Sequence, residues 1–369
     1  MWLNHPLEIK QEKSQLSSNN SFAVEKTMKT KYHFGLYGLI MLMLIWLPRL
    51  SAQSKVGTTA VPFLGISVGP RATAMGSAYT AMTSDATSIY YNPGSFVQNP
   101  KSQVVIAHTK WLANTSLNWV GLSFKLNPSN AIGISVTQLD YGDDERVTTV
   151  SQPEGTGEKW GASDLCASLS YSRLLTYRFS IGGSFKYIQQ RIWNENASAF
   201  AMDVGLLFVT QFNDMRLGMS ISNFGTDMQM NGKDLLKQVD LDPETIGHNE
   251  TIVARLKTEK WPLPLFFRVG LAMDVIRMNQ VKFTLAADAL RPSDNTETLN
   301  VGGELALARI IFLRAGYKSL MRDDSEEGLT FGAGLQLQVP NMMAIDIDYT
   351  LADFGLFETI NMFAVGIQF

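Results

Sequence analysis

The sequence predicts an all-β protein, a transmembrane 14-stranded antiparallel β-barrel with an N-terminal plug, or hatch, inside its lumen. Three observations support this fold class. Many short segments alternate apolar residues with polar or small ones, as a strand with one apolar face does. The number of these segments is even, and short connections alternate with longer ones, which is the rule for bacterial outer-membrane barrels. The last segment is amphipathic to its end, where it closes on the aromatic residue Phe369.

The composition agrees with this class and excludes several others. Hydrophobic residues make up 45% of the chain and charged residues 18%, a balance that excludes a disordered protein. The net charge of −3 gives none of the positive field with which a typical nucleic-acid-binding protein attracts phosphate. The single cysteine, Cys166, excludes an intrachain disulfide and a cysteine-rich metal site.

The N-terminal region is expected to be removed during export. Residues 28–52 have a positively charged start, an apolar stretch over 34–47 and small residues before a cleavage position near Ala52, as a signal peptide does. We interpret residues 1–27 as the product of an upstream start codon, with a cytoplasmic extension before a signal anchor as the alternative. The mature chain would then begin at Gln53 and enter the outer membrane.

The predicted strands are the segments with period-two alternation. Met343, Ile345 and Ile347 lie on one face of the clearest segment, and Asp346 and Asp348 lie on the other. Segments of about ten residues with this pattern are typical of transmembrane barrel strands. The fourteen segments are 102–111, 115–126, 131–140, 163–175, 178–189, 198–210, 214–223, 263–276, 279–289, 297–307, 310–318, 328–338, 342–351 and 359–369.

The connections predict the orientation. Short turns such as 127–130 and 176–177 follow even-numbered segments, whereas the long connections 141–162 and 224–262 follow odd-numbered ones. Short turns face the periplasm in outer-membrane barrels and longer loops face outward, so both ends of the barrel are expected on the periplasmic side. A soluble β-sandwich would also alternate, but fourteen strands whose second faces are rich in Gly, Ala and Ser would make it oversized.

Charged residues on the predicted strands are expected to face the lumen, because a charge on the lipid face is costly. They should pair with one another and with the plug. Arg71 of the plug should pair with an inward carboxylate, for which Asp346, Asp348 and Asp274 are the first candidates. The predicted lumen charges are Lys186, Arg268, Asp274, Asp288, Arg314, Lys318, Asp346 and Asp348.

Residues 53–100 precede the barrel, 101–369, and do not alternate. Their glycines and small residues allow close packing, as a plug inside a barrel requires. Asp85 could cap a short helix that Asn92-Pro93 ends. The predicted hatch residues are Gly69, Arg71, Met75, Gly76, Asp85, Asn92 and Pro93.

Two parts of the chain resemble known outer-membrane barrels. The segment 69–94 resembles the N-terminal hatch of FadL-type barrels in its Arg71, Met75-Gly76, Asp85-Ala86 and Asn92-Pro93. The segments 60–64 and 261–271 resemble the PorV/PorQ branch of Bacteroidota, and Phe369 resembles the terminal recognition signal of these barrels. The resemblance implies fourteen strands and a role in type IX protein secretion, in which PorV receives cargo from the translocon and delivers it to the surface attachment machinery.

The sequence gives little support to catalysis or metal binding. His108 and His248 are the histidines after the signal, and no Ser-His-Asp spacing stands out, so we expect neither an enzyme nor a cofactor. The acidic run Asp140, Asp143, Asp144 and Glu145 has ligands suited to Ca²⁺, but a solvated acidic loop is the simpler interpretation.

The function we predict is a type IX secretion barrel that binds secreted cargo or attachment-complex partners at the cell surface. The alternative is a FadL-like channel with a hydrophobic ligand in the lumen. Outer-membrane lipid would surround either protein, and neither would bind nucleic acid. Exposed apolar residues of an outside loop commonly mark a contact surface. The candidate partner residues, in loop 224–262, are Leu235, Leu236, Ile246 and Trp261.

Overall fold

The computed structural model describes residues 56–369 apart from 84, 143–144, 240–251, 323–324, 340–342 and 358. Residues 54–369 form one compact unit. The predicted signal peptide, the upstream extension and Ile246 lie outside the described residues, as do Asp143 and Asp144. No helix among the described residues is long and apolar enough to cross a membrane.

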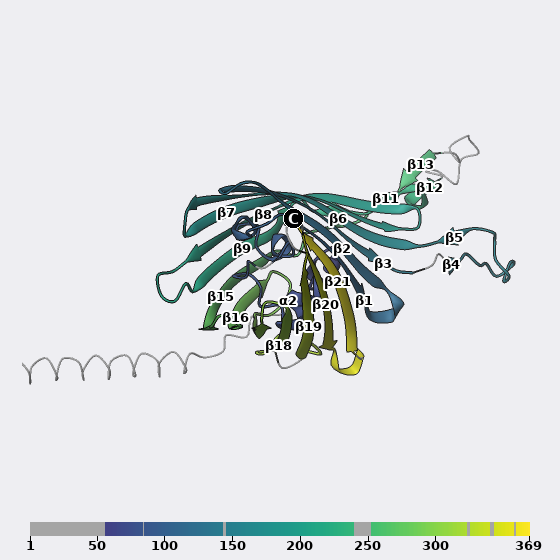
Figure 1. Ribbon diagram of the computed structural model, residues 1–369. Coiled ribbons are helices and arrows are strands. Elements are labelled where there is room, and N and C mark those ends of the chain that lie inside the picture. The colour runs from purple at the N-terminus through teal and green to yellow at the C-terminus, as the bar shows by residue number, and fades with distance from the viewer. Residues whose placement is uncertain are drawn as a thin grey trace, which may run out of the picture. The chain divides into compact units, whose positions relative to one another are not determined.

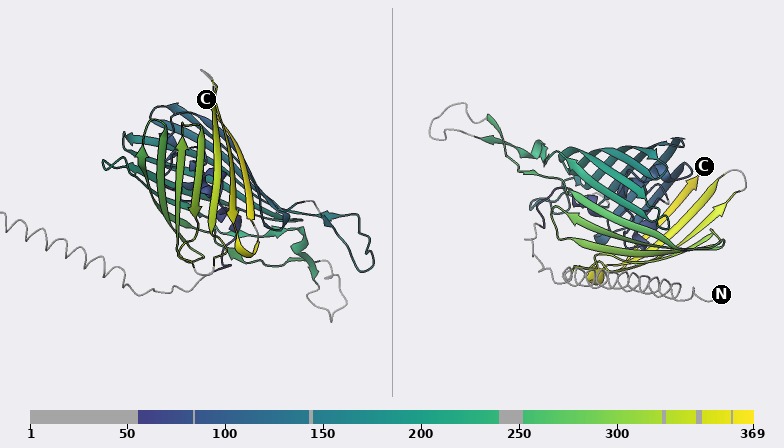
Figure 2. Two further views of the ribbon diagram at one scale, coloured as in Figure 1. Left: turned by 60° about the horizontal axis from the view of Figure 1, so that its bottom comes forward. Right: turned by 90° about the vertical axis from the view of Figure 1, so that its left-hand side faces the viewer.

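Within the described residues, fourteen strands form one closed antiparallel barrel, which confirms the predicted fold class. Neighbouring strands pair in chain order, β8 pairs with β9, and β21 pairs with β1 to close the wall (Figures 1 and 2). The strands are β1 (Gln103–Lys110), β2 (Ser116–Asn127), β3 (Asn130–Asp140), β6 (Ala162–Thr176), β7 (Phe179–Ile192), β8 (Glu195–Val209), β9 (Arg216–Gly225), β15 (Phe266–Arg277), β16 (Val281–Pro292), β17 (Thr298–Leu307), β18 (Ile311–Tyr317), β19 (Leu329–Gln338), β20 (Ala344–Asp353) and β21 (Thr359–Gln368).

Several of the predicted strand boundaries are wrong. The expected loop 190–197 is a tight turn at 193–194, because β7 and β8 stay paired up to Ile192 and Glu195. The polar ends of these two strands stay hydrogen-bonded beyond the apolar band of the barrel. Both of their faces are exposed to water there, so apolar and polar residues no longer alternate in the sequence. The strand expected from residue 263 begins at Phe266, since Pro262 and Pro264 have no backbone N–H to donate to the ladder.

The two faces of the wall have the chemistry that the alternation predicts. Outward residues such as Leu329 and Phe331 are exposed, whereas the intervening Thr330 is buried. Small polar groups on the inner face bond across neighbouring strands, as in the 2.7 Å contact between the hydroxyls of Ser135 and Ser168. The outer face is therefore suited to lipid, and the inner face to a polar, tightly packed interior.

The plug is the segment before β1. It contains four short helices, η1 (Pro62–Gly65), α2 (Pro70–Ala74), α3 (Ser88–Tyr91) and η2 (Phe96–Gln98). Inside the barrel, Ala72, Ala74, Met75, Ala78 and Tyr79 are fully buried, and Figure 1 shows α2 enclosed by the strands.

Glycines allow the plug and the wall to touch through their backbones. Gly76 has φ +63°, and a Cβ there would lie 2.6 Å from the carbonyl oxygen of Tyr317. A Cβ on Gly302 or Gly316 would in turn collide with the backbone of Met75 or Gly76. The glycines of both segments therefore create one close contact between plug and wall.

The longer connections carry short elements outside the barrel. The connection after β3 contains the ribbon β4 (Glu145–Arg146) with β5 (Lys159–Trp160). The connection after β9 contains β10 (Met228–Gln229) paired with β14 (Lys260–Trp261), β11 (Asn231–Gly232) paired with β8, η4 (Lys233–Leu235), and the ribbon β12 (Leu236–Val239) with β13 (Ile252–Arg255). The remaining 3₁₀ turns are η3 (Leu112–Asn114) and η6 (Gly355–Phe357). Figures 1 and 2 show the two ribbons extending from the same end of the barrel.

Candidate functional site

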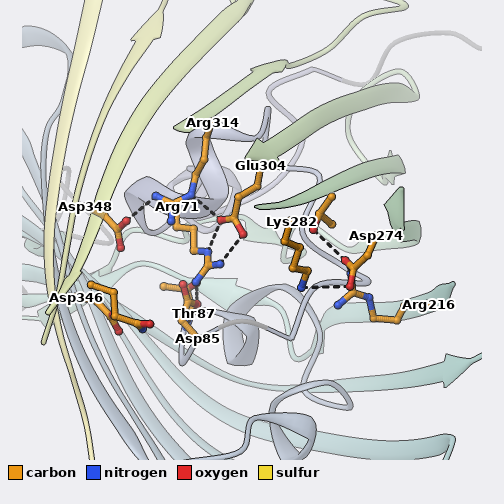
Figure 3. A network of polar contacts seen from close by, with 12 residues as sticks. Arg71, Asp85, Thr87, Arg216, Asp274, Lys282, Glu304, Arg314, Asp346 and Asp348 are labelled. Carbon is orange, nitrogen blue, oxygen red and sulfur yellow. Dashed lines mark hydrogen bonds and ion pairs between the residues drawn. The ribbon is translucent and has the colours of Figure 1, made fainter. Parts of the chain in front are cut away.

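A buried ion-pair network fixes the plug to the wall. Arg71 donates from Nε and Nη2 to the two carboxylate oxygens of Glu304, at 2.8 and 2.7 Å (Figure 3). Arg314 also donates to Glu304 at 2.7 Å and continues to Asp348 at 2.5 Å. Both guanidinium groups lie over the ring of Phe312, 5.3 Å from its centroid. The two arginines and two carboxylates balance in charge, and the bidentate geometry is a strong form of ion pair.

Arg71 thus pairs with an inward carboxylate, as expected, but the three residues named as its first candidates are wrong. Asp348 is occupied by Arg314, and Asp346 accepts hydrogen bonds from three glutamine side chains. Those from Gln103, Gln336 and Gln368 are 3.0, 2.7 and 2.7 Å long. These amides satisfy a half-buried carboxylate without a cation.

Asp274, the third expected partner, lies in a separate group of charges (Figure 3). It contacts Arg216 at 3.0 Å, Arg277 at 2.9 Å and Lys282 at 3.2 Å. This group lies at the end of β15, beside the short turn to β16 and away from Arg71. Its ion pairs join β9, β15 and β16 at that end of the wall.

Asp85 lies next to Arg71 but does not cap α3 in the predicted way. Its Oδ1 accepts hydrogen bonds from the backbone N–H, at 2.9 Å, and the hydroxyl of Thr87, the residue before the helix. Burial raises the pKa of the Asp85 carboxyl above its ordinary value, although Arg71 and Thr87 oppose the shift. The helix does end at Asn92, as expected.

The Asn92-Pro93 turn binds the plug to β8. The Asn92 amide donates to the carbonyl oxygens of Thr80 at 2.8 Å and Leu206 at 2.9 Å. Its own oxygen accepts from the N–H of Gly94 at 2.9 Å. The Asn92 side chain therefore has hydrogen-bond partners both in the plug and in the wall.

The predicted lumen charges on β7 and β16 have specific partners. Lys186 lies 2.6 Å from Asp203 and donates to Asn223 at 2.8 Å. Asp288 accepts the backbone N–H groups of Tyr79 and Thr80, both at 2.8 Å, and so holds the plug directly.

Arg268 and Lys318 lie between the plug and the outer mouth. The Arg268 guanidinium donates to Ser222 at 3.1 Å and stacks 5.0 Å from the centroid of Phe266. Lys318 joins the plug residue Ser67, at 2.9 Å, to Glu327, at 2.6 Å.

Burial acts to raise the pKa of the Glu327 carboxyl, but Lys318 and its hydrogen bonds outweigh burial and hold this pKa below its ordinary value. The ion pair closes the loop between β18 and β19, and the hydrogen bond from Lys318 to Ser67 ties that loop to the plug.

Sequence reasoning missed several carboxylates that carry these contacts, above all Glu304 and Asp203. Glu304 has the same parity as Asn300 and Gly302, so the alternation of its strand already places it on the lumen face. Parity gives the face of a residue but not its neighbours around the lumen, which is why its pairing with Arg71 could not be read from the sequence.

The wall is continuous around the plug. Each of the fourteen described barrel strands is hydrogen-bonded to both neighbours. The ladder of β8 and β9 shifts at a bulge near Asp203 and Asn223, where the Asn223 amide donates to the carbonyl oxygen of Pro264 at 2.9 Å. Three cavities between plug and wall have volumes of about 30, 10 and 10 Å³, each with room for a water or two at most.

A larger pocket of about 250 Å³ opens at the outer mouth, between η1 of the plug and the loops after β16 and β18. Its walls combine aromatic side chains with charged ones. They include Trp111, Phe266, Phe354, Asp294, Arg322 and Glu327.

The candidate partner residues precede Pro264, a residue of this pocket, in the chain. The exposed fractions of their side chains differ. Leu236 and Trp261 are exposed, Leu235 is half-buried, and Val253 of the same ribbon is 60% exposed. Figure 2 shows the β12–β13 ribbon extending away from the barrel, and Leu236 and Val253 on it are exposed, so the described part of the ribbon is not a lid that buries them.

Comparison with known proteins gives a family and a fold. The family model "Type IX secretion system protein PorV" matches residues 49–234. Among solved structures, the "CymD monoaromatic hydrocarbon channel" has a TM-score of 0.51 and 11% identity, over 82% of this chain and 96% of that one. The Pseudomonas putida toluene transporter TodX has a TM-score of 0.50 and 12% identity, over 80% and 96%. At this identity the two structures show the fold alone. No curated protein sequence matches.

The family match extends from before the plug through the first seven barrel strands and into the loop that carries β10 and β11. The matched residues thus include the plug helices, with their glycines and the Asn92-Pro93 turn. The closed barrel is the fold expected for an outer-membrane protein of this family. The chain therefore belongs to the PorV family of type IX secretion system proteins.

Proposed function

We propose that this barrel serves type IX secretion by binding secreted proteins or attachment-complex partners at its outer end. One contrast carries the proposal: the lumen is filled by the plug, whereas the outer end presents a pocket and extended ribbons with exposed apolar residues. Contiguous apolar surface outside the membrane is typical of protein contact sites. The ribbons also have unpaired strand edges to which another strand could add.

A channel for hydrophobic compounds is the alternative function. It requires an apolar pocket in the lumen and a route through the wall or past the plug. The described lumen instead holds ion pairs, and its cavities of about 30, 10 and 10 Å³ are smaller than a drug-sized ligand site. The mouth pocket of about 250 Å³ is the space that could start such a route, so the two functions must be separated by experiment.

The orientation is the first testable point. Protease added to intact cells should cut within 145–160 or 233–258, because both ribbons extend beyond the barrel. The turn joining β2 to β3 at 127–130 should be spared until the outer membrane is broken. Cutting at this turn from outside would reverse the orientation and with it the proposal.

Photo-crosslinking tests partner binding itself. A photoreactive amino acid at Val253, 60% exposed on the outer ribbon, should give adducts with secreted proteins in native cells. The matched control is position Gln238, which pairs with Val253 in the same ribbon. The double variant Val253→Ser, Leu256→Ser should lower surface-attached cargo more than Gln238→Ser does. Equal effects of the apolar and polar substitutions, with no adducts at Val253, would contradict the proposal.

A further inference from the structure

The outer wall of the barrel has an apolar hollow of about 630 Å³ over β15 to β19. Its floor consists of small residues at outward positions on three adjacent strands, Ala287 on β16, Gly303 on β17 and Ala315 on β18. Gly303 lies directly opposite Ala315 in the strand register. Three neighbouring strands thus lack large outward side chains at nearly the same height.

Large side chains surround this floor. Leu271 lies opposite Ala287, Leu285 lies opposite Gly303, and Tyr317 lies opposite Leu329. These rim residues are exposed on the outer surface. The hollow is therefore a depression between tall apolar neighbours rather than a gap in the ladder, which is continuous here.

The wall is only one backbone thick behind the floor. Gly302 and Gly316 face each other on the lumen side, and a Cβ on either would meet the backbone of Met75 or Gly76. Because these two residues are glycines whose backbone already contacts the plug, the inside of the barrel has no group that could reach the hollow. Only a group outside the barrel can fill it.

The position and chemistry of the hollow identify the occupant. It is continuous with the lipid-facing surface of the barrel, and its lining consists of Gly, Ala, Val, Leu, Met and one Tyr, with no charged group. A void beside apolar walls forfeits dispersion contacts, and a flexible hydrocarbon chain can supply them without needing a polar partner. We propose that an acyl chain of an outer-membrane lipid occupies this hollow, across β16, β17 and β18.

Lipid photolabelling tests this site. The full-length mature protein is reconstituted in nanodiscs of phosphatidylethanolamine that contain a small share of lipid with a diazirine in its acyl chain. After illumination, labelled peptides are mapped by mass spectrometry. Peptides of β16–β18 should be labelled severalfold more than those of β2–β3, where Val120, Ile134 and Val136 have similar exposure but do not line this hollow.

Two substitutions make the test specific: one places a large side chain in the hollow, and a matched one places the same side chain outside it. Ala315→Leu should reduce labelling of β16–β18 severalfold, because the new side chain occupies the floor. Ala333→Leu, at an exposed outward position on β19 outside the lining, should leave it unchanged. If Ala315→Leu does not fold, as judged by heat-modifiable mobility in gels, Ala287→Leu replaces it.

Uniform labelling of both regions that Ala315→Leu does not change would overturn the site. So would labelling in nanodiscs that is lost in native membranes together with crosslinks to another membrane protein, because a protein would then cover the hollow. Either result leaves the role of the outer ribbons in partner binding untouched, since that role does not depend on this surface.

Discussion

Replacing Arg71 by alanine is expected to destabilise the barrel by about 3–5 kcal/mol, as the loss of one partner of a buried ion pair does. The substitution removes both hydrogen bonds to Glu304 and leaves that carboxylate with Arg314 alone. It also removes the ion pair that ties α2 to β17, so the plug should loosen and the outer membrane should admit more dye or large antibiotic. The temperature at which heat-modifiable mobility is lost measures the first effect, and dye uptake measures the second.

The exposed pair Arg291–Glu297, with N–O 3.2 Å, provides the control. Arg291→Ala should change stability by about 1 kcal/mol or less, because a solvated pair contributes little. The double variant Arg71→Ala, Glu304→Ala should lose less than the sum of the single variants, since the interaction that joins the two side chains is counted in both single losses. An Arg71→Ala protein with unchanged melting and unchanged permeability would mean that this pair does not hold the plug.

The sequence predicted the fold well because a lipid-facing strand has a simple rule. Every second residue must be apolar, so β19 and β20 could be recognised from Leu329 to Leu337 and from Ile345 to Leu351 without knowledge of their neighbours. The rule fails outside the membrane, where neither face needs to be apolar. There the sequence predicts a loop, whereas the polar ends of β7 and β8 are paired strands.

The site was less predictable because it depends on heights and angles around the lumen. Alternation placed Asp346 and Asp348 on the inner face, but their partners are glutamines and Arg314, which come from other strands. The position of α2 relative to β17 decides that Arg71 meets Glu304. The hollow on the outer wall likewise requires the register of three strands, because Gly303 and Ala315 become neighbours only when β17 pairs with β18.

Removal of the β12–β13 ribbon is expected to abolish partner binding while leaving a folded barrel. Deleting residues 233–257 and joining the ends with a short Gly-Ser linker should be tolerated, because the hydroxyl of Thr258 donates to the carbonyl oxygen of Met230 at 2.6 Å and so keeps the two ends together. The barrel ladder of β8, β9 and β15 does not include the deleted residues.

The other outer ribbon offers a matched control. Deleting 148–155 shortens the β4–β5 connection. The two new ends are again held together, because the N–H of Thr156 donates to the carbonyl oxygen of Val147 at 2.8 Å. Both deletion proteins should keep heat-modifiable mobility. If the apolar residues of β12–β13 and its flanks form the partner surface, the 233–257 deletion should have the larger effect on cargo.

The most direct measurement is the fraction of secreted cargo attached at the cell surface in cells whose barrel lacks residues 233–257, taken together with uptake of a hydrophobic compound by the same cells. A barrel that works by binding proteins at its outer end predicts that surface cargo falls severalfold and collects in the periplasm, with uptake unchanged. Surface cargo at the normal level together with altered uptake of the compound would contradict it and identify the barrel as a channel.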